Sequence, residues 1–205
     1  MPITELKPGI TADMTLDAVI EQSFDSSPDT SYQTELICDW FLTHHVNQRE
    51  PDEIIPNLHN QPHIKRWYLV RRHEPMAGFD PEALRPLNDP RLGEPENVYI
   101  HRFLESDEDR ALHDHPWSWI SHILWGSYLE HTPADPKTPN GVTVATRRRA
   151  GEATIRLDGS WPHRIELEAN QPLTLFITGD KKRNWGFWCP QGWRHHEEFA
   201  VYGCD

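Results

Sequence analysis

The sequence is poor in cysteine and has no long hydrophobic run. Its three cysteines, Cys38, Cys189 and Cys204, are odd in number and widely spaced, so they predict neither a disulfide framework nor a zinc ribbon. No apolar run approaches the ~18 residues that a membrane-spanning helix needs, and the opening stretch, "MPITELKPGI", lacks the basic and apolar regions of a secretory signal. We therefore expect a protein of the reducing cytoplasm with no membrane partner, in which Cys189 is a packed thiol.

Basic residues are also scarce. The 205 residues include 20 Lys and Arg against 32 Asp and Glu, which gives a formal net charge of −12. A surface that binds nucleic acid needs a net basic face, and the one basic cluster, residues 147–149, is too short to provide it. We therefore expect no nucleic-acid partner.

The first 96 residues predict an extension rather than a separate core. Residues 11–47 have a helical pattern, in which Thr30 and Gln33 form a capping box and a following aromatic and aliphatic stripe faces the core. Residues 48–96 are rich in Pro, Asn and charge, with one strand in "HIKRWYLVRR". We interpret them as an irregular arm that wraps the domain or contributes to a homodimer interface.

From Asn97 onward the pattern changes to short strands. The turn signals Asn140-Gly141, Asp158-Gly159 and Gly179-Asp180 separate several of them. Strands at this spacing, without helix signals between them, are typical of an antiparallel sandwich or barrel. We therefore predict an extension over residues 1–96 and a β barrel over 97–205. The expected strands are "NVYIHRFL", "WISHILWGSYLEHT", "GVTVATRRR", "EATIRL", "HRIELE", "LTLFIT", "WGFW" and "RHHEEFAVY".

A His-x-His pair stands at the start of this β region, in "LHDHPWSW". Alternate side chains of a strand face the same way, so His113 and His115 point to one side together. In "PHRIELE", His163 shares the apolar face with Ile165 and Leu167. A buried histidine of this kind can simply bond a backbone carbonyl. Together with an inward His pair, it indicates a metal site with three imidazole ligands.

These two stretches carry a family resemblance. "HDHPWSWISHILWG" and "GSWPHRIEL" resemble the two strand motifs of the cupin superfamily, with His113, His115 and Gly126 in the first and Pro162 and His163 in the second. Within that superfamily they are similar to the three-histidine thiol dioxygenases, the cysteine dioxygenase-like group. The resemblance covers about residues 97–190. It implies an all-β cupin jelly-roll barrel, here with a helical and irregular N-terminal extension.

The chain departs from the cupin pattern at three places. Trp119 stands where many cupins carry a glutamate ligand, so the resemblance implies a ligand set of three histidines. Phe176 stands where cysteine dioxygenases rely on a tyrosine, and no cysteine lies near Ile120 to form their thioether cross-link. These differences argue against cysteine itself as the substrate.

Such a site suits several metals, because imidazole binds most first-row divalent ions. With Fe(II), the resemblance implies a mononuclear non-haem iron dioxygenase that acts on a small molecule, such as a thiol or amino-acid-like substrate, with O₂. With Zn, Ni or Mn, a redox-neutral isomerase or lyase is the alternative. A cupin that binds a small ligand without turnover is a third possibility.

The substrate pocket is predicted from strand parity. Arg102 in "YIHRFL" is expected to act as the catalytic anchor for an anionic substrate, although a surface position is equally compatible with the pattern. His101 takes the inward place in the other register. The expected aromatic wall, for which plain core packing is the alternative, consists of Trp117, Trp119, Trp125 and Trp185.

Overall fold

The computed structural model describes residues 11, 13–26, 30–57, 59–107 and 111–204. The chain begins with two helices, α1 (Leu16–Ser26) and α2 (Thr30–Phe41), and a π-helical turn, η1 (Leu42–Val46). Two 3₁₀ segments, η2 (Pro81–Leu87) and η3 (Pro90–Leu92), precede the main run of strands. The opening stretch and the Thr30 side chain of the predicted capping box lie outside the described residues. Within the described part of the chain, every helix is too short or too polar to span a membrane.

Most of the remaining chain forms β-sheet. Within the described residues, seven strands make one antiparallel sheet in the order β1-β2-β4-β11-β6-β9, with β3 added on β2; we call it the large sheet. Two smaller sheets have the orders β10-β7-β8 and β13-β12-β5. The strands of the large sheet are β1 (Glu53–Pro56), β2 (Pro62–Arg71), β3 (Glu74–Pro75), β4 (Asn97–Phe103), β6 (Trp119–Trp125), β9 (Ala153–Arg156) and β11 (Leu173–Thr178). Those of the smaller sheets are β5 (Leu112–His113), β7 (Ser127–Pro133), β8 (Thr143–Arg149), β10 (Arg164–Leu167), β12 (Gly186–Cys189) and β13 (Gly192–His195).

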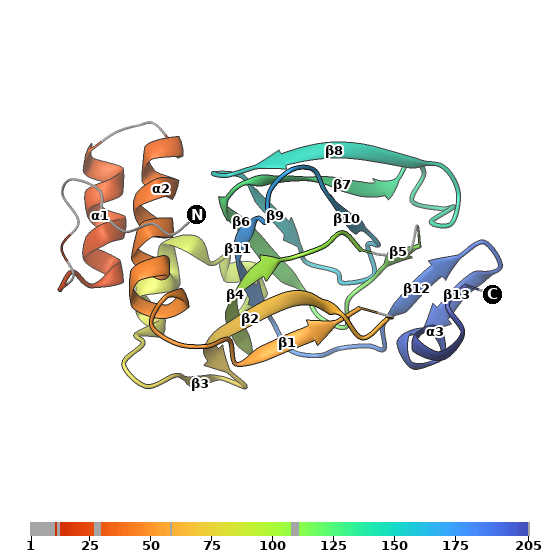
Figure 1. Ribbon diagram of the computed structural model, residues 1–205, viewed down its shortest axis with the longest axis horizontal. Helices are drawn as coiled ribbons and strands as arrows, with labels where there is room; N and C mark the ends of the chain where they lie inside the picture. Colours follow the sequence, from red (N-terminus) through yellow and green to blue (C-terminus); the bar gives the residue numbers. More distant parts are fainter. Residues whose placement is uncertain (1–10, 12, 27–29, 58, 108–110, 205) are drawn as a thin grey trace.

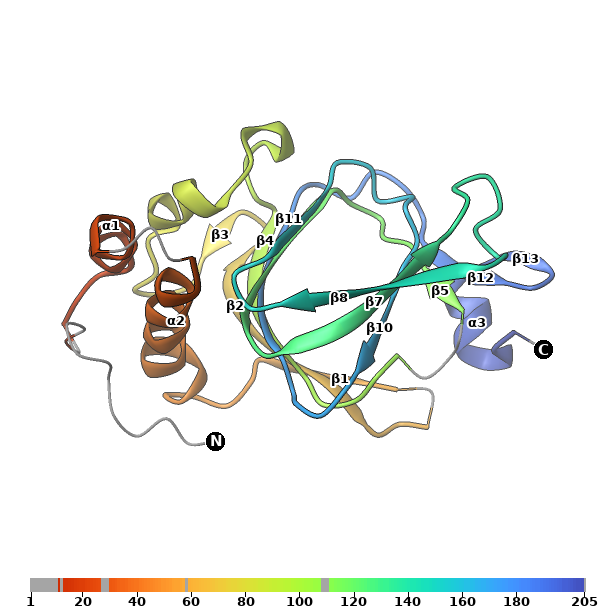
Figure 2. The ribbon, with the colours of Figure 1, turned by 90° about the horizontal axis from the view of Figure 1, so that it is seen from above.

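The sheets face each other around a common interior. In Figures 1 and 2, β7, β8 and β10 lie across from β2, β4 and β11, while α1 and α2 cover the opposite side of the large sheet. The predicted all-β fold with a helical N-terminal extension is confirmed. The extension also contributes β1 and β2, which pair into the same sheet as β4. The boundary between residues 96 and 97 therefore falls inside one sheet, and the division into two units stays a prediction.

The large sheet buries both of its faces. On β4, Val98 and Ile100 pack into the cluster formed with α1 and α2; we call this side the outer face. Tyr99 and Phe103 point the other way, into the barrel, which we call the inner face. Because helices cover one side and strands the other, both faces need apolar side chains.

The C-terminal segment differs from the prediction in two ways. The expected strand "RHHEEFAVY" is instead the end of β13 followed by a helix, α3 (His196–Tyr202). Glu197 and Glu198 occupy the first turn of this helix, where negative charge favours helix formation.

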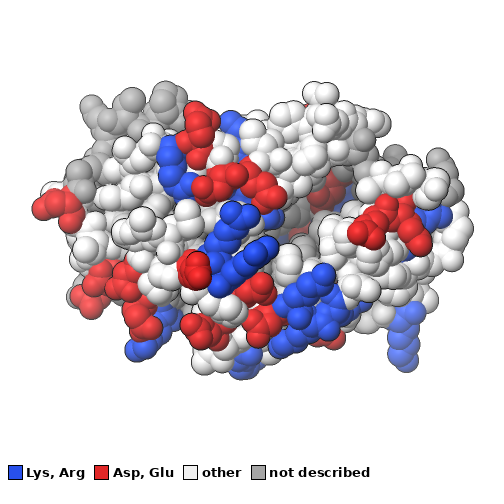
Figure 3. Space-filling view, turned by 90° about the horizontal axis from the view of Figure 1, so that it is seen from below, with Lys and Arg blue, Asp and Glu red and all other residues white. Residues whose placement is uncertain are grey.

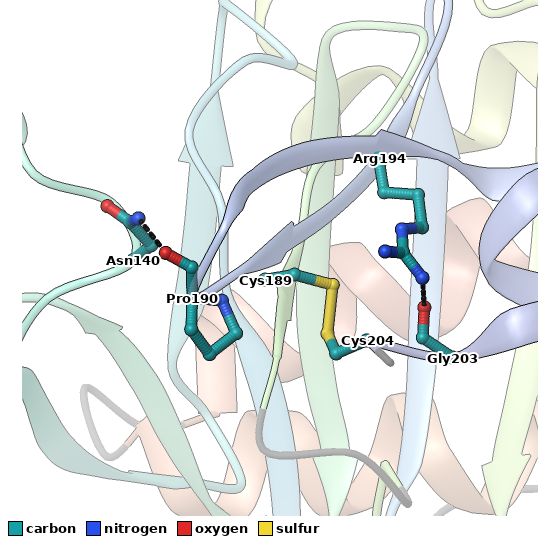
Figure 4. The surroundings of a disulfide bond; sticks show 6 residues. All are labelled: Asn140, Cys189, Pro190, Arg194, Gly203 and Cys204. Atoms are coloured by element: carbon teal, nitrogen blue, oxygen red, sulfur yellow. Dashed lines mark hydrogen bonds between the residues drawn. A yellow bond between two sulfur atoms is a disulfide. The ribbon is translucent and has the colours of Figure 1, made fainter.

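Cys189 is not a free thiol, because it forms a disulfide with Cys204 across 15 residues. Figure 4 shows this bond beside the hydrogen bond from Arg194 Nη1 to the Gly203 carbonyl oxygen, 2.6 Å long. Cys38 is buried and does not take part in this disulfide. Cysteines far apart in sequence meet here because α3 folds back onto β12. Disulfides are typical of oxidising compartments, and the cytoplasmic location stays a prediction.

Candidate metal centre

The structure brings the three predicted histidines together; we call them the histidine cluster. His113 on β5 and His163 just before β10 exchange both backbone hydrogen bonds, of 2.8 and 2.9 Å. One ring nitrogen from each of His113, His115 and His163 lies within 4.8 Å of the others. The Nε2 atoms of His115 and His163 are 2.9 Å apart. His163 is buried, whereas His113 and His115 are partly accessible. The cluster is therefore open to solvent on the side of His113 and His115.

Glu130 on β7 fixes the orientation of the His163 ring. Its Oε1 lies 3.0 Å from His163 Nδ1, and its Oε2 accepts a 2.8 Å hydrogen bond from Arg148 Nε. Burial opposes ionisation of Glu130, but its hydrogen bonds with His163 and Arg148 and the positive charge of Arg148 outweigh it and lower its pKa to about 2. An ionised Glu130 only accepts, so His163 Nδ1 donates to it. His163 Nε2 therefore presents its lone pair to the cluster, as in many protein metal sites.

The donor set fits a first-row metal ion. Burial lowers the pKa of His113 to about 4 and that of His115 well below its ordinary value, so both rings are neutral at pH 7. Neutral imidazole is the ligand form. Two imidazole nitrogens bound at right angles, each about 2.0–2.1 Å from a metal, lie about 3 Å apart. The 2.9 Å separation of His115 and His163 matches this distance. That the cluster holds a metal stays a prediction at this point.

Hydrogen bonds of Asp114 and of the His115 backbone hold the His-x-His stretch in place. Asp114 is fully buried and accepts hydrogen bonds from Gly186 N at 2.8 Å and from Trp193 Nε1 at 3.0 Å. Its side chain thus ties the His-x-His stretch to β12 and β13. On the other side, His115 N donates to the Gly159 carbonyl oxygen at 2.8 Å. A Cβ at Gly159 would lie 2.4 Å from the His115 carbonyl oxygen, so this approach requires glycine.

Asp107 lies near His113, another member of the histidine cluster. One of its carboxylate oxygens is 3.8 Å from His113 Nδ1, and the other is 3.4 Å from His63 Nε2. Its position is fixed because Oδ2 also accepts a 2.6 Å hydrogen bond from Ile165 N. At 3.8 Å this carboxylate is too far from His113 Nδ1 for a hydrogen bond, so only His163 has its ring oriented by a carboxylate in this way.

Aromatic rings, Trp117 and Trp119 among them, lie beside the cluster. The Trp119 ring centroid is 5.1 Å from that of His163 and 5.4 Å from that of His115. Phe176 lies 6.1 Å and Trp117 6.5 Å from His115. These rings are largely buried and exclude water from one side of the histidines.

Two other tryptophans lie farther from the histidines. The prediction for Trp125 is wrong, because it lies at the end of β6 with 43% of its surface exposed. Trp185 stacks on His196 at 4.6 Å and is 5.7 Å from Phe187. Phe187 is in turn 5.7 Å from His113. Trp185 is thus one ring removed from the cluster.

The predicted anchor Arg102 faces away from the histidines. Its guanidinium lies 6.0 Å from the Trp67 ring, on the outer face of the large sheet. His101 takes the inward place instead, 5.6 Å from Phe176. Sequence alone did not separate the registers, because residues on both faces of β4 are buried.

The inner face instead carries Arg66, which sequence reasoning missed. Arg66 Nε donates a 2.9 Å hydrogen bond to His101 Nε2. Its guanidinium lies 4.3 Å above the Tyr99 ring. The alternation in "HIKRWYLVRR" could have indicated Arg66, because it places Arg66 on one face with Tyr68 and Lys65 on the other with Trp67. Glu130 and Asp107 had no comparable signal, because their neighbours on β7 and in the loop after β4 show no clear alternation.

Comparisons with known proteins do not identify a family. No protein-family model matches the chain, and no curated protein sequence matches it. Among solved structures, the chain is similar to one in "Crystal structures of DMSP lyases RdDddP and RnDddQII", at 13% identity and a TM-score of 0.44, over 82% of this chain and 74% of that one. It is also similar to the DMSP lyase DddQ from Ruegeria pomeroyi DSS-3, at 15% identity and a TM-score of 0.42, over 94% and 86%.

A structure of oxalate oxidase is similar at 12% identity and a TM-score of 0.40, over 67% of this chain and 61% of that one. At this level of similarity none of these proteins establishes an activity for the chain. The functional conclusion therefore has to come from the site itself.

Proposed function

We propose that the protein is a mononuclear non-haem iron dioxygenase that acts on a small molecule, with His113, His115 and His163 as its metal ligands. The convergence of three imidazole nitrogens, without a carboxylate among them, supports this proposal. Among the described residues, the nearest buried carboxylate, Glu130, is bonded to the far side of His163. Three protein ligands leave coordination positions for substrate and O₂, and a bound Fe(II) would supply the electrons that activate O₂.

The surrounding residues have separate roles in this proposal. Glu130 holds the His163 ring in the ligand tautomer. Asp107 places a carboxylate charge 3.8 Å from His113 Nδ1. Trp119 and Phe176 keep water away from one side of the metal position. His101, held by Arg66, provides the polar part of the inner wall, and we assign the substrate contact to it in place of Arg102.

The test is to measure metal content and O₂ uptake together. Protein loaded with Fe(II) under anaerobic conditions should retain about one iron per chain. It should consume O₂ with at least one member of a panel of small thiols and amino acids. His163→Ala should lose both metal and O₂ uptake. His73→Asn, which removes an exposed histidine far from the cluster, should keep both.

The outcomes separate the candidate functions. Wild-type protein that retains no divalent metal overturns the metal proposal. Metal retained with substrate conversion that needs no O₂ would replace the dioxygenase by a redox-neutral isomerase or lyase, which the same ligand set suits with Zn, Ni or Mn. Substrate binding without conversion would indicate a ligand-binding protein.

A further inference from the structure

A second pocket lies on the outer face of the large sheet. Its volume is about 450 Å³, which is within the range of small-molecule sites. Residues 46–51, at the end of η1 and just after it, form one side, and Lys65, Trp67 and Arg102 form the other; we call it the outer pocket. Because Arg102 and His101 are adjacent on β4, the outer pocket and the histidine cluster lie on opposite faces of the sheet.

Two cations face each other in this pocket. Lys65 on β2 and Arg102 on β4 are direct cross-strand partners. Like charges directly opposite each other destabilise an antiparallel pair. Within the described residues neither side chain makes an ion pair, and the recorded contact of the Arg102 guanidinium is with the Trp67 ring at 6.0 Å. Partial burial lowers the pKa of Arg102.

The other charged groups of the pocket do not neutralise this pair. Arg49 also lines it, but its guanidinium is bonded to Asp52 and donates a 2.8 Å hydrogen bond to the Tyr68 carbonyl oxygen. Glu50 is a lining carboxylate and is exposed to solvent. Figure 3, seen from the side of β1 and β2, shows Lys and Arg interspersed with Asp and Glu over this side of the molecule. A locally cationic pocket is unexpected in a chain of net charge −12.

The floor of the outer pocket is rigid. The Trp67 side chain is 3% exposed, and its Nε1 donates a 3.1 Å hydrogen bond to the Arg49 carbonyl oxygen. This bond fixes the 46–51 segment against β2. The cations are therefore held on an ordered apolar base, which reduces the entropy lost when a ligand binds.

We propose that the outer pocket binds a small organic anion through its carboxylate or phosphate group, which lies between Lys65 and Arg102. An oxyanion there converts a repulsive pair into two favourable ones, because guanidinium and ammonium groups both bind such oxygens. The apolar part of the ligand contacts Trp67. The ligand bridges the helical extension and the barrel. This inference does not depend on the metal.

The experiment measures thermal unfolding and calorimetric binding with two probes, inorganic phosphate and succinate. Potassium chloride at equal ionic strength and neutral succinamide serve as comparisons. For wild-type protein the unfolding midpoint should rise with at least one oxyanion and with neither comparison. Lys65→Gln/Arg102→Gln should bind that oxyanion at least tenfold more weakly, and its midpoint without ligand should be higher because the repulsion is gone.

The matched control is Lys137→Gln/Arg85→Gln, which removes the same charge from exposed positions outside the pocket and should bind as wild type does. If the double variant does not fold, Lys65→Gln alone should still weaken binding. A response to phosphate only, or to succinate only, identifies the preferred group. An equal response in wild type and variant, or no response to either probe, overturns the proposal. His163→Ala should keep oxyanion binding, so this result is independent of the proposed metal function.

Discussion

Glu130 is a charged group with almost no access to water, and such a group is tolerated only where its oxygens have partners. Its side chain is 2% exposed, and its oxygens contact His163, Arg148 and, at 3.7 Å, Arg156. Loss of its charge removes the buried partner of Arg148 and frees the His163 ring to rotate. Glu130 therefore serves the fold and the histidine cluster together.

Glu130→Gln should weaken metal binding by tenfold to a hundredfold, the usual effect of losing a carboxylate behind a ligand histidine. The amide still fills the space but no longer fixes the Nδ1 proton. Metal affinity measured by competition with a chelator checks this, and circular dichroism confirms folding. Glu166→Gln, which changes a carboxylate on the adjacent strand with 43% of its side chain exposed, is the control. A folded Glu130→Gln protein with wild-type affinity contradicts the role assigned to Glu130.

At the scale of elements, β12, β13 and α3 form a unit beside the histidine cluster. Phe187 on β12 stacks on Phe199 of α3 with 3.6 Å between ring centroids, and it also contacts His113. The disulfide between Cys189 and Cys204 closes this unit. Order in the C-terminal helix is thereby connected to the position of His113 in the histidine cluster.

Cys204→Ser should lower the free energy of unfolding by about 3 kcal/mol, as expected for a disulfide that closes a loop of this length. Urea unfolding of the oxidised wild type and the variant measures the difference. Dithiothreitol should lower the stability of the wild type to that of the variant and leave Cys204→Ser unchanged. If the oxidised wild type and the variant are equally stable, the bond does not constrain the unit.

The elements differ in how far the sequence predicts them. Alternation identifies strands with one polar face, such as "HRIELE", and this places His163 inward beside the His-x-His pair. It does not identify the inward side of β4, because the helices on the outer face require apolar residues there too. Arg102 was therefore assigned to the wrong face. Trp125 has the right parity but lies at a strand end, beyond the covered part of the interior.

Contacts between distant segments could not be predicted in the same way. The disulfide depends on α3 folding back onto β12, and the bond of Glu130 to His163 depends on the pairing of β7 with β10. Neither pairing leaves a local pattern in the sequence. The fold class and the three histidines were thus accessible from the sequence, while the groups that orient them were not.

At the scale of the whole molecule, folding depends on pH through histidines whose pKa is lowered, and the partly buried His45 is one of them. It lies next to Trp40, Phe41 and Phe79, where the extension packs on the large sheet. Burial, with the nearby charges of Arg49 and His44, lowers its pKa from 6.5 to about 4. Below pH 6.5 the unfolded chain binds a proton that the folded chain does not. Stability is therefore lost as the pH falls from 6.5 towards 4.

His45→Leu should remove this part of the pH dependence. Between pH 7 and pH 5 the wild type should lose about 1 to 2 kcal/mol more than the variant, given the shift in pKa and the partial exposure of the ring. Urea unfolding at the two pH values measures the difference. Between pH 7 and 8 the curves should run parallel, because the imidazole is neutral in both states. Parallel curves down to pH 5 would show that His45 is protonated in the folded protein.

The strand β4 separates two compartments with neighbouring residues: His101 faces the histidines and Arg102 faces the outer pocket. Substitutions at either position act on one compartment. A single-residue deletion within β4 would instead exchange the two faces, since the side chains alternate. It would place the guanidinium inside the barrel and the imidazole under the helices, so both chemistries would be lost at once. This strand therefore tolerates changes of residue type far better than changes of length.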